Sequence, residues 1–370
     1  MPPSSADFES AGLYDPASPD AAERLALLEW LVAHGATIEQ MVRAVAHGTL
    51  LDVAGDLGRA RTEPLTLAQV SAATGMPVAR IEAIRFAVGL PPVAPDEPVM
   101  SAEEGRTLAV FELGRELFGE AALRRFTQVI GASVARIAEA AIALSLADLL
   151  APIRERGGGE LALAQARLGA AQSVGPLAQA VGTLFKAHMD VAARRIAAWH
   201  TRDALDTVSA AVGFLDLVGF TTVARRVDAR GLAAIIDRFE ETAYDVTTAA
   251  GGRVVKFIGD EVMFVTADPA RACDIALTLV ERFAGDDAVT PRGAIAAGDV
   301  LVRGGDYYGP VVNLASRAAG LAVPREILVT DAVATAAGAA FRFEPAGRRA
   351  LKGFDEPVRL AAVERATRSA

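Results

Sequence analysis

Residues 254–265 read VVKFIGDEVMFV, two apolar runs on either side of a Gly-Asp-Glu. β-Branched and aromatic residues are enriched in strands, and a Gly-X pair is typical of two-residue hairpin turns. The stretch therefore predicts strands at 253–258 and 261–266, with Asp260 at the tip of a hairpin. Lys256 stands inside an apolar strand, where a charge without a partner is costly. We expect this lysine to have either a partner or a function.

Around the hairpin, short β-branched runs alternate with stretches of helical periodicity. This alternation predicts further strands at 211–217, 292–302 and 326–329 and a strand pair within 340–364. It predicts helices at about 219–227, 230–249, 268–284 and 310–320. A domain that mixes hairpin and crossover connections is the natural solution for this order of elements.

Before residue 205 the chain is rich in Ala and Leu and shows helical periodicity. Helices are expected at 21–34, 37–54, 101–118, 120–151 and 160–200, with helix-turn-helix spacing at 65–90. Residues 1–20 hold several Pro, Ser and Asp and are expected to form a loose arm. The chain is thus predicted to contain an all-helical domain of residues 1–200 and a mixed domain of residues 206–370.

Composition restricts the function. The length of 370 residues is typical of two or three domains, and a net charge of −9 disfavours general affinity for nucleic acid or anionic membranes. A single cysteine, Cys273, excludes an intramolecular disulfide framework and favours a cytoplasmic location. We expect no signal peptide and no transmembrane segment. The apolar stretch 132–153 is interrupted by Arg136, Glu139 and Asp148, which favours a buried or amphipathic helix.

Two carboxylates are candidates for a metal site. Asp216 lies inside the apolar run AVGFLDLV, where it needs a counter-charge to stay ionised, and Asp260 lies at the hairpin tip. If the end of the first strand meets this tip, the two negative charges repel each other. A divalent cation relieves that conflict, and oxygen ligands favour Mg²⁺ or Mn²⁺ with substrate phosphates completing the coordination.

A polar cluster follows in GGDYYGPVVNLASRAAGL, residues 304–321. Asp306 precedes a Tyr-Tyr-Gly loop, and Asn313 and Arg317 are four residues apart, on one face of a helix. An amide suits a ribose and a guanidinium suits a phosphoryl group. Lys352, beside a glycine, carries little information by itself.

Together these clusters resemble the catalytic domain of class III nucleotide cyclases. The resemblance rests on F-x-D-x-x-G-F-T at 214–221, K-x-x-G-D at 256–260 and D-Y-Y-G-x-x-V-N-x-A-S-R at 306–317, and it covers about 205–365. It implies an α+β, ferredoxin-like βαββαβ fold. It also implies an adenylyl cyclase that forms 3′,5′-cyclic AMP and pyrophosphate from ATP at a homodimer interface.

The resemblance also implies residue roles. Two metal ions, Mg²⁺ or Mn²⁺, would be bound by Asp216 and Asp260 with the backbone at Leu217. The other chain of the dimer would supply the remaining residues. Lys256 and Asp306 would select the base, and Asn313 would orient the ribose. Arg317 would stabilise the transition state, and Lys352 would contact the triphosphate.

The choice of base can be argued from hydrogen bonding. Adenine presents an acceptor at N1 and a donor at its 6-amino group. Lys256 is a donor and Asp306 an acceptor, so the pair matches adenine, whereas guanine reverses both polarities. Two mismatched polar contacts cost on the order of 10²–10⁴ in selectivity, which favours ATP over GTP.

The helical half resembles, more weakly, the regulatory domain of some actinobacterial adenylyl cyclases, which implies a restraint on catalysis that responds to pH. The segment 177–200 would be the coupling helix. Its apolar seam packs on its own domain, pairs two chains or couples the two halves of the chain. It consists of Phe185, Met189, Ala192, Ile196 and Trp199. The open alternatives for the regulator are a proton, acting through His188 or His200, and a small apolar ligand.

Alternative functions remain at this stage. One is a guanylyl cyclase. Another is a diguanylate cyclase, because Gly259-Asp260-Glu261 is similar to the Gly-Gly-Asp-Glu-Phe turn of that family. A third is a DNA-binding regulator with a nucleotide sensor, which the helix-turn-helix spacing at 65–90 suggests. The second helix of this segment has only two basic residues, Arg80 and Arg85. This small number argues against DNA binding.

Overall fold

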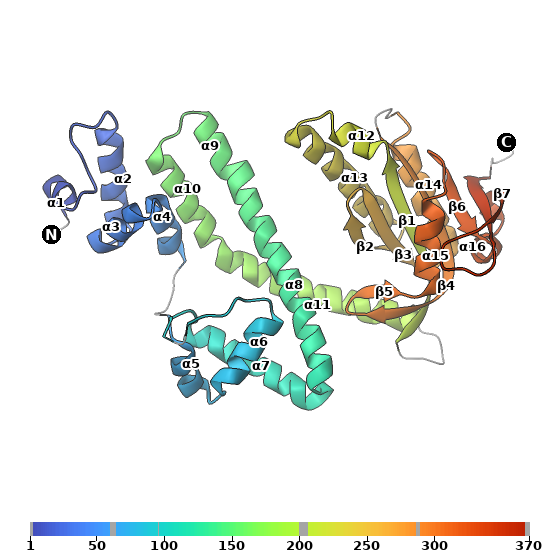
Figure 1. Cartoon of the computed structure of the whole chain (residues 1–370), viewed down its shortest axis with the longest axis horizontal. Helices are drawn as coiled ribbons and strands as arrows, with labels where there is room; N and C mark the ends of the chain where they lie inside the picture. Colours follow the sequence, from blue (N-terminus) through green and yellow to red (C-terminus); the bar gives the residue numbers. More distant parts are fainter. Residues whose placement is uncertain (1–2, 60–63, 95, 200–205, 286–288, 367–370) are drawn as a thin grey trace. The chain divides into compact units, whose positions relative to one another are not determined.

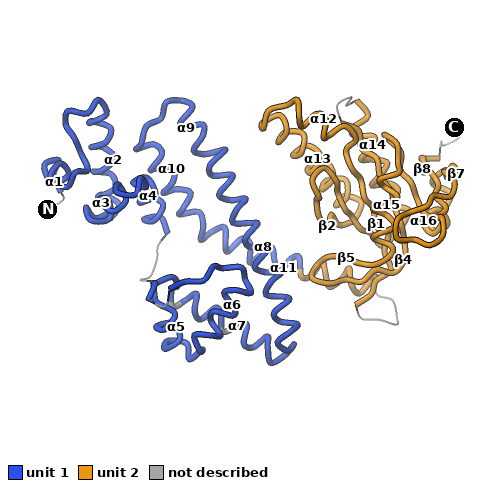
Figure 2. The backbone as a smooth tube through the Cα atoms, in the orientation of Figure 1, with its two compact units in different colours: residues 1–188 blue, residues 189–370 orange. Residues whose placement is uncertain are grey.

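The computed structural model describes residues 3–59, 64–94, 96–199, 206–285 and 289–366 (Figure 1). The chain divides into two compact units, Met1–His188 and Met189–Ala370 (Figure 2). The predicted boundary at 200–206 stays a prediction, because residues 200–205 and with them His200 lie outside the described residues.

The second unit is built on one sheet of eight strands within the described residues, in the order β2-β3-β1-β4-β6-β8-β7 with β5 paired to β4. The strands are β1 (Thr207–Val218), β2 (Arg253–Ile258), β3 (Glu261–Thr266), β4 (Thr290–Arg303), β5 (Asp306–Tyr308), β6 (Ile327–Thr330), β7 (Phe341–Arg349) and β8 (Val358–Arg365). The antiparallel order β2-β3-β1-β4, with helices after β1 and β3, is the βαββαβ arrangement, so the α+β prediction is confirmed.

Helices cover both faces of this sheet, and they are α12 (Phe220–Ala224), α13 (Ala229–Ala249), α14 (Pro269–Arg282), α15 (Pro310–Ala319) and α16 (Asp331–Ala337). Alternate residues of a strand point to opposite faces. Leu215 of β1 packs with α13 and α14, and Phe214 packs with α15. We call these the α13/α14 face and the α15 face. The sequence did not predict β5 or α16.

Cys273 belongs to the core of the α13/α14 face. It has no exposed surface, and burial raises the pKa of its thiol to about 12. A thiol in this position is a small core residue without reactivity.

The first unit is helical, with α1 (Ser5–Ser10), α2 (Ala21–Ala33), α3 (Ile38–Ala46), α4 (Leu50–Gly58), α5 (Leu67–Thr74), α6 (Val78–Ala87), α7 (Ala102–Phe118), α8 (Glu120–Leu144), a π-helical turn (Ser145–Leu150), α9 (Ala151–Glu155) and α10 (Glu160–Gln172). The prediction of a loose arm at 1–20 was wrong. Phe8 of α1 is fully buried and Leu13 is 5% exposed, in one core with α2. Two large apolar side chains anchor this segment.

The prediction of one helix at 37–54 was also wrong, although its N-cap was correct. Thr37 accepts a hydrogen bond from the Gln40 N–H at 3.2 Å, as expected. The helix then ends at Gly48, which has a φ of +70°. The Thr49 N–H donates to Ala44 O and the Gly48 N–H to Val45 O, the pair of bonds that closes a helix at a left-handed glycine.

The predicted helix at 160–200 is two helices, α10 and α11 (Val174–Trp199). Pro176 has no N–H to donate to the Gln172 carbonyl, and α10 ends at Gln172. Three residues of the apolar seam on α11 are exposed in the single chain: Phe185 (54%), Met189 (54%) and Ile196 (40%). Trp199 is the seam residue that packs on a core, that of the α15 face.

The helix Glu120–Glu155 is long and apolar enough to cross a membrane by length and composition, which is weak evidence by itself. Its π-helical turn comes before Pro152, which cannot donate to the Asp148 carbonyl, and a wider turn accommodates that loss. Residues 132–153 were expected to form a buried or an amphipathic helix, and the structure does not bury them, because Ile142 is 61% and Leu144 63% exposed.

Candidate active site

A β-bulge decides where Lys256 points. Val254 lies opposite Phe264 on the α13/α14 face, but the register shifts between Val254 and Lys256. Lys256 therefore lies opposite Met263, whose side chain belongs to the α15 face. In a regular strand Lys256 would share the face of Val254, two residues before it. The bulge moves the lysine to the other face of the sheet.

On the α15 face Lys256 forms an ion pair, as expected for a charge inside an apolar strand. Its Nζ lies 2.5 Å from Oδ2 of Asp306, the first residue of β5. Asp306 Oδ1 accepts a second hydrogen bond, from the Tyr307 N–H at 2.8 Å. The side chains are 38% and 23% exposed, so both polar ends remain accessible to a ligand. The structure thus brings together the two residues predicted to read the base.

The two predicted metal carboxylates also come together. β1 and β3 are antiparallel, and Asp216 lies opposite Glu261, next to Asp260. The Leu217 N–H donates to the Asp260 carbonyl at 3.2 Å, which ties the end of β1 to the hairpin tip. Because N–H and C=O of a strand residue lie on the same side, the Leu217 carbonyl also faces this tip.

Sequence reasoning missed Arg292 at this site. Its Nε and Nη2 donate to Oδ1 and Oδ2 of Asp216 at 2.9 and 3.1 Å, and its Nη1 donates to the Ala322 carbonyl at 2.9 Å. Arg292 lies opposite Asp216 in the register of β1 and β4. The available signal was an arginine at the start of the apolar run PRGAIAAG. Its partner is 76 residues away, so only the strand register reveals the pair.

The carboxylates crowd each other. Burial and the Asp216 charge raise the pKa of Asp260, against the opposing effects of its backbone hydrogen bond and of Arg292. Burial, Asp216 and Asp260 together raise the pKa of Glu261 from 4.5 to about 7. The hydrogen bonds to Asp216 raise the pKa of Arg292. The site therefore holds more negative charge than one arginine neutralises.

Glu261 makes stability depend on pH. Between its unfolded pKa of 4.5 and its folded pKa of about 7 the folded chain binds more protons than the unfolded chain. This contribution to stability is therefore present below pH 4.5 and lost as the pH rises through 7. The prediction concerns the free energy of unfolding of Glu261→Gln minus that of wild type, measured with EDTA present. This difference is expected to be about 1–2 kcal/mol larger at pH 8 than at pH 5, a value that already includes a reduction for solvent screening.

Urea unfolding at the two pH values measures this difference. Glu241→Gln changes an exposed carboxylate on α13 and is the matched control. An equal difference from wild type at both pH values for Glu261→Gln would contradict the coupling.

The donor set fits a hard divalent cation. The carboxylates of Asp216 and Asp260 lie close enough to affect each other, the Leu217 carbonyl faces the hairpin tip, and oxygen donors suit Mg²⁺ or Mn²⁺. Within the described residues, no group of three His, Cys, Asp or Glu side chains is able to hold a metal by itself. A bound cation therefore needs further oxygen ligands, such as phosphates, and competes with Arg292 for Asp216.

The remaining predicted residues lie on the surface of the second unit. Asn313 and Arg317 are exposed on α15, one turn apart, and Lys352 is exposed in the segment between β7 and β8. Among the described residues, no hydrogen bond or ion pair joins Asn313 or Arg317 to the carboxylates. One chain thus presents the predicted residues as separate groups.

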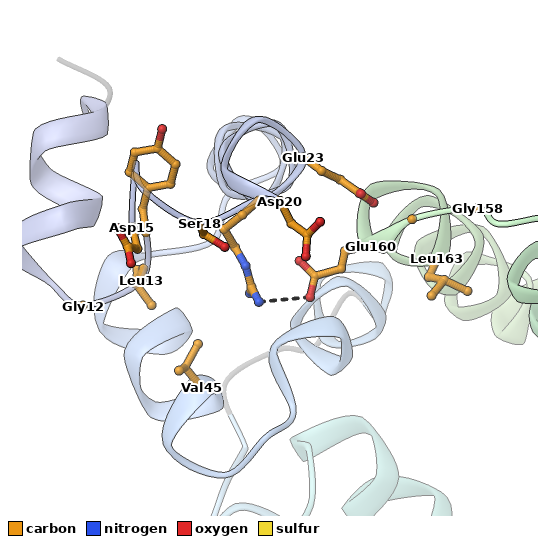
Figure 3. A pocket seen from close by; sticks show the side chains of 13 residues that line it. Gly12, Leu13, Asp15, Ser18, Asp20, Glu23, Val45, Gly158, Glu160 and Leu163 are labelled. Atoms are coloured by element: carbon orange, nitrogen blue, oxygen red, sulfur yellow. Dashed lines mark ion pairs between the residues drawn. The ribbon is translucent and has the colours of Figure 1, made fainter.

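A separate hollow lies in the first unit, near the start of α2 and α10 (Figure 3). Its lining includes the carboxylates of Asp15, Asp20 and Glu23 and the ion pair between Arg24 and Glu160, whose atoms are 3.0 Å apart. None of the predicted site residues lines it.

Comparisons with known proteins extend over both units. Residues 7–195 match the family model described as adenylate cyclase regulatory domain. An uncharacterized protein of Mycobacterium tuberculosis strain H37Rv is 32% identical over 357 residues, which cover 95% of this chain and 92% of that protein. The pH-sensitive adenylate cyclase of M. tuberculosis strain CDC 1551 is 32% identical over 365 residues, which cover 94% and 90%.

Other known proteins match a shorter part of the chain. An adenylate cyclase of Streptomyces coelicolor is 46% identical over 125 residues, 34% of this chain and 33% of that enzyme. Among solved structures, an adenylyl cyclase of P. aeruginosa covers 44% of this chain and 97% of its own length, at 22% identity and a TM-score of 0.40. The regulatory-domain match and the nearly full-length relative show that the chain belongs to the actinobacterial adenylate cyclases, with an N-terminal regulatory domain and a class III catalytic domain.

Proposed function

We propose that this adenylate cyclase converts ATP to 3′,5′-cyclic AMP and pyrophosphate in composite sites of a homodimer. The observation that carries the proposal is the ion pair of Lys256 and Asp306. The ammonium only donates and the carboxylate only accepts, which matches N1 and the 6-amino group of adenine. Both groups keep free hydrogen-bonding capacity, because Asp306 has four lone-pair positions and Lys256 three protons.

The exposure of two site residues on α15 supports a homodimer. Asn313 and Arg317 are exposed on α15 and have no bond to Asp216 or Asp260 in the described part of the chain. A two-fold dimer brings the α15 surface of one chain to the carboxylates of the other and completes two identical sites.

The reaction is an intramolecular phosphoryl transfer. The ribose 3′-oxygen forms a bond to the α-phosphorus, the bond from that phosphorus to the bridging oxygen breaks, and the 3′-hydroxyl proton passes to solvent. When bound at Asp216 and Asp260, two Mg²⁺ or Mn²⁺ ions would lower the pKa of this hydroxyl and neutralise the departing pyrophosphate.

Three residues of the partner chain complete the chemistry. Asn313 orients the ribose, and Arg317 donates to the oxygens on which charge develops at the phosphorus. Lys352 binds the triphosphate, and the base pocket of Lys256 and Asp306 holds the nucleotide in register. Fixed donors of this kind typically contribute about 10²–10³ to the rate.

The first unit would regulate this activity. Its match to the regulatory-domain model and the name of the pH-sensitive relative support a response to pH. His188, exposed on α11, is the described histidine nearest to the second unit in sequence. A cytoplasmic location is part of the same proposal.

The test is an assay of the full-length chain with ATP or GTP, with Mg²⁺ or Mn²⁺, at several pH values. Cyclic AMP is expected from ATP, with a strong preference over GTP and a rate that varies with pH. The complete absence of cyclic AMP under all these conditions would contradict the proposal. Cyclic GMP as the main product would favour the alternative of a guanylyl cyclase.

The structure weakens the DNA-binding alternative. α5 and α6 do form a helix-turn-helix, with Gly75 in the left-handed conformation between them. However, Arg80 forms ion pairs with Glu112 and with Glu120, the latter at 2.8 Å. Arg85 is 7% exposed and donates to the Pro91 carbonyl. Neither arginine is free to bind phosphates of DNA.

A further inference from the structure

The bulge in β2 has a second effect, on Arg253. This residue lies opposite Val265, whose side chain belongs to the α15 face, and Lys256 lies opposite Met263 on the same face. In a regular strand two residues three positions apart point to opposite faces. Because of the bulge, both cations of β2 reach the same side of the sheet.

The two cations bind consecutive residues of one turn. Arg253 Nη2 donates to the Gly305 carbonyl at 2.9 Å, and Lys256 Nζ binds the carboxylate of Asp306 at 2.5 Å. The Arg253 guanidinium also lies over the Tyr307 ring, 5.7 Å from its centroid. β2 therefore contacts Gly305 and the two residues after it.

This turn has little internal support. Gly304 and Gly305 have φ values of +61° and +79°, and β5 is only three residues long. Glycine loses much conformational entropy when it is ordered, so two successive glycines make the turn easy to deform. Asp306 follows directly, and its position depends on groups outside the turn.

The end of α11 reaches the core of the α15 face through one residue. Trp199 packs on the core of the α15 face, which contains Tyr307, a residue only 4% exposed. The Arg195 guanidinium lies 5.8 Å from the centroid of the Trp199 ring. Burial lowers the pKa of Arg195, and the positive charge of Arg253 lowers it further. This places Arg195 near Arg253.

We propose that Arg253 is a positioning residue for base recognition, which holds the β4–β5 turn so that Asp306 stays paired with Lys256, and that Trp199 at the end of α11 supports the same turn through Tyr307. The inference rests on the proposed function, because it assigns a role to the pocket for the base. It also makes base recognition the step on which the end of α11 acts.

A positioning role predicts a particular kinetic pattern. Without Arg253 the turn relaxes and Asp306 spends less time on Lys256, so the pocket loses its match to adenine. The KM for ATP is expected to rise, while kcat changes less, because Asp216, Asp260 and Arg317 lie outside this turn. The preference for ATP over GTP is expected to fall with the KM effect.

The experiment compares Arg253→Met with Arg271→Met in the full-length chain. Methionine keeps an apolar stem without the guanidinium. The control arginine, Arg271, also donates to a loop carbonyl, that of Ala250 at 3.3 Å, but on α14. For Arg253→Met, the ATP/GTP ratio of kcat/KM is expected to fall about 10-fold, the loss that one charged hydrogen bond accounts for. The Arg271 variant is expected to stay within about twofold of wild type.

Further variants keep the test decisive. Arg253→Lys retains the charge and is expected to restore part of the ATP preference. Trp199→Phe is expected to raise the KM for ATP in the same direction, with the exposed neighbour Arg194→Ala as its control. If Arg253→Met does not fold, Arg253→Lys against wild type carries the test. An unchanged ATP/GTP ratio in the folded variants, or a fall in kcat alone, would overturn the proposal.

Failure of the proposed function is recognised separately. If the wild-type chain makes no cyclic nucleotide, titration calorimetry with ATP and GTP measures the preference directly. Weaker ATP binding and lost preference in Arg253→Met would then still support the positioning role, and equal binding by the wild type and this variant would contradict it.

Discussion

An equimolar mixture of Lys256→Ala and Asp260→Ala chains is expected to recover about a quarter of wild-type cyclase activity, although each chain alone is inactive. Random pairing places half of the chains in mixed dimers. Each mixed dimer has one site with an intact Asp260 from one chain and an intact Lys256 from the other. Its second site lacks both residues.

The reason lies in the hairpin that carries both residues. Lys256 points to the α15 face because of the bulge, while Asp260 sits at the tip beside Asp216. If these positions serve different sites, the defects complement each other; if they serve one site within a chain, they do not. The activity of the mixture is measured after dilution and concentration, which allows chains to exchange.

A control makes the result specific. Mixing Asp216→Ala with Asp260→Ala chains removes two residues of the same half-site, so this mixture is expected to stay inactive. Recovery in that mixture, or its absence in the first one when the chains do form dimers, would contradict the composite site.

The second large effect is expected from exchanging the charges of the base pocket. The double substitution Lys256→Glu, Asp306→Lys keeps an ion pair and reverses the donor and the acceptor. The ATP/GTP ratio of kcat/KM is expected to fall on the order of 10²–10⁴-fold, because two polar contacts to the base change from matched to mismatched for adenine.

Single substitutions serve as controls for this exchange. Lys256→Glu alone or Asp306→Lys alone replaces the ion pair with two neighbouring like charges, and each is expected to weaken the binding of both nucleotides. A double variant that keeps the preference of wild type for ATP would show that the base is recognised elsewhere.

Local patterns predicted much of the catalytic unit. The hairpin strands at 253–258 and 261–266 have the predicted bounds, because β-branched runs on either side of a Gly-Asp turn depend on neighbouring residues only. The helical unit was predicted less well. Its errors at Gly48 and Phe8 arose because a glycine inside an apolar pattern and a short N-terminal segment depend on their packing.

Some contacts of the site residues were likewise predicted from the sequence, and others were not. Lys256 and Asp306 were expected together, and they form an ion pair. Arg292 was not expected beside Asp216, because nothing in the neighbourhood of either residue in the sequence points to the other. The predicted roles of Asn313, Arg317 and Lys352 stay predictions, since one chain leaves them exposed on the surface.

The sequence by itself determined which segments become strands and which residues are candidates for the chemistry, because side-chain type and periodicity are local properties. The tertiary structure alone decided which face each of those residues occupies. One extra residue in β2 turns Lys256 toward Asp306 and aligns Arg253 with it, and the register of β1 with β4 places Arg292 on Asp216. Strand register and bulges are set by the packing of the whole sheet, which joins residues far apart in the chain.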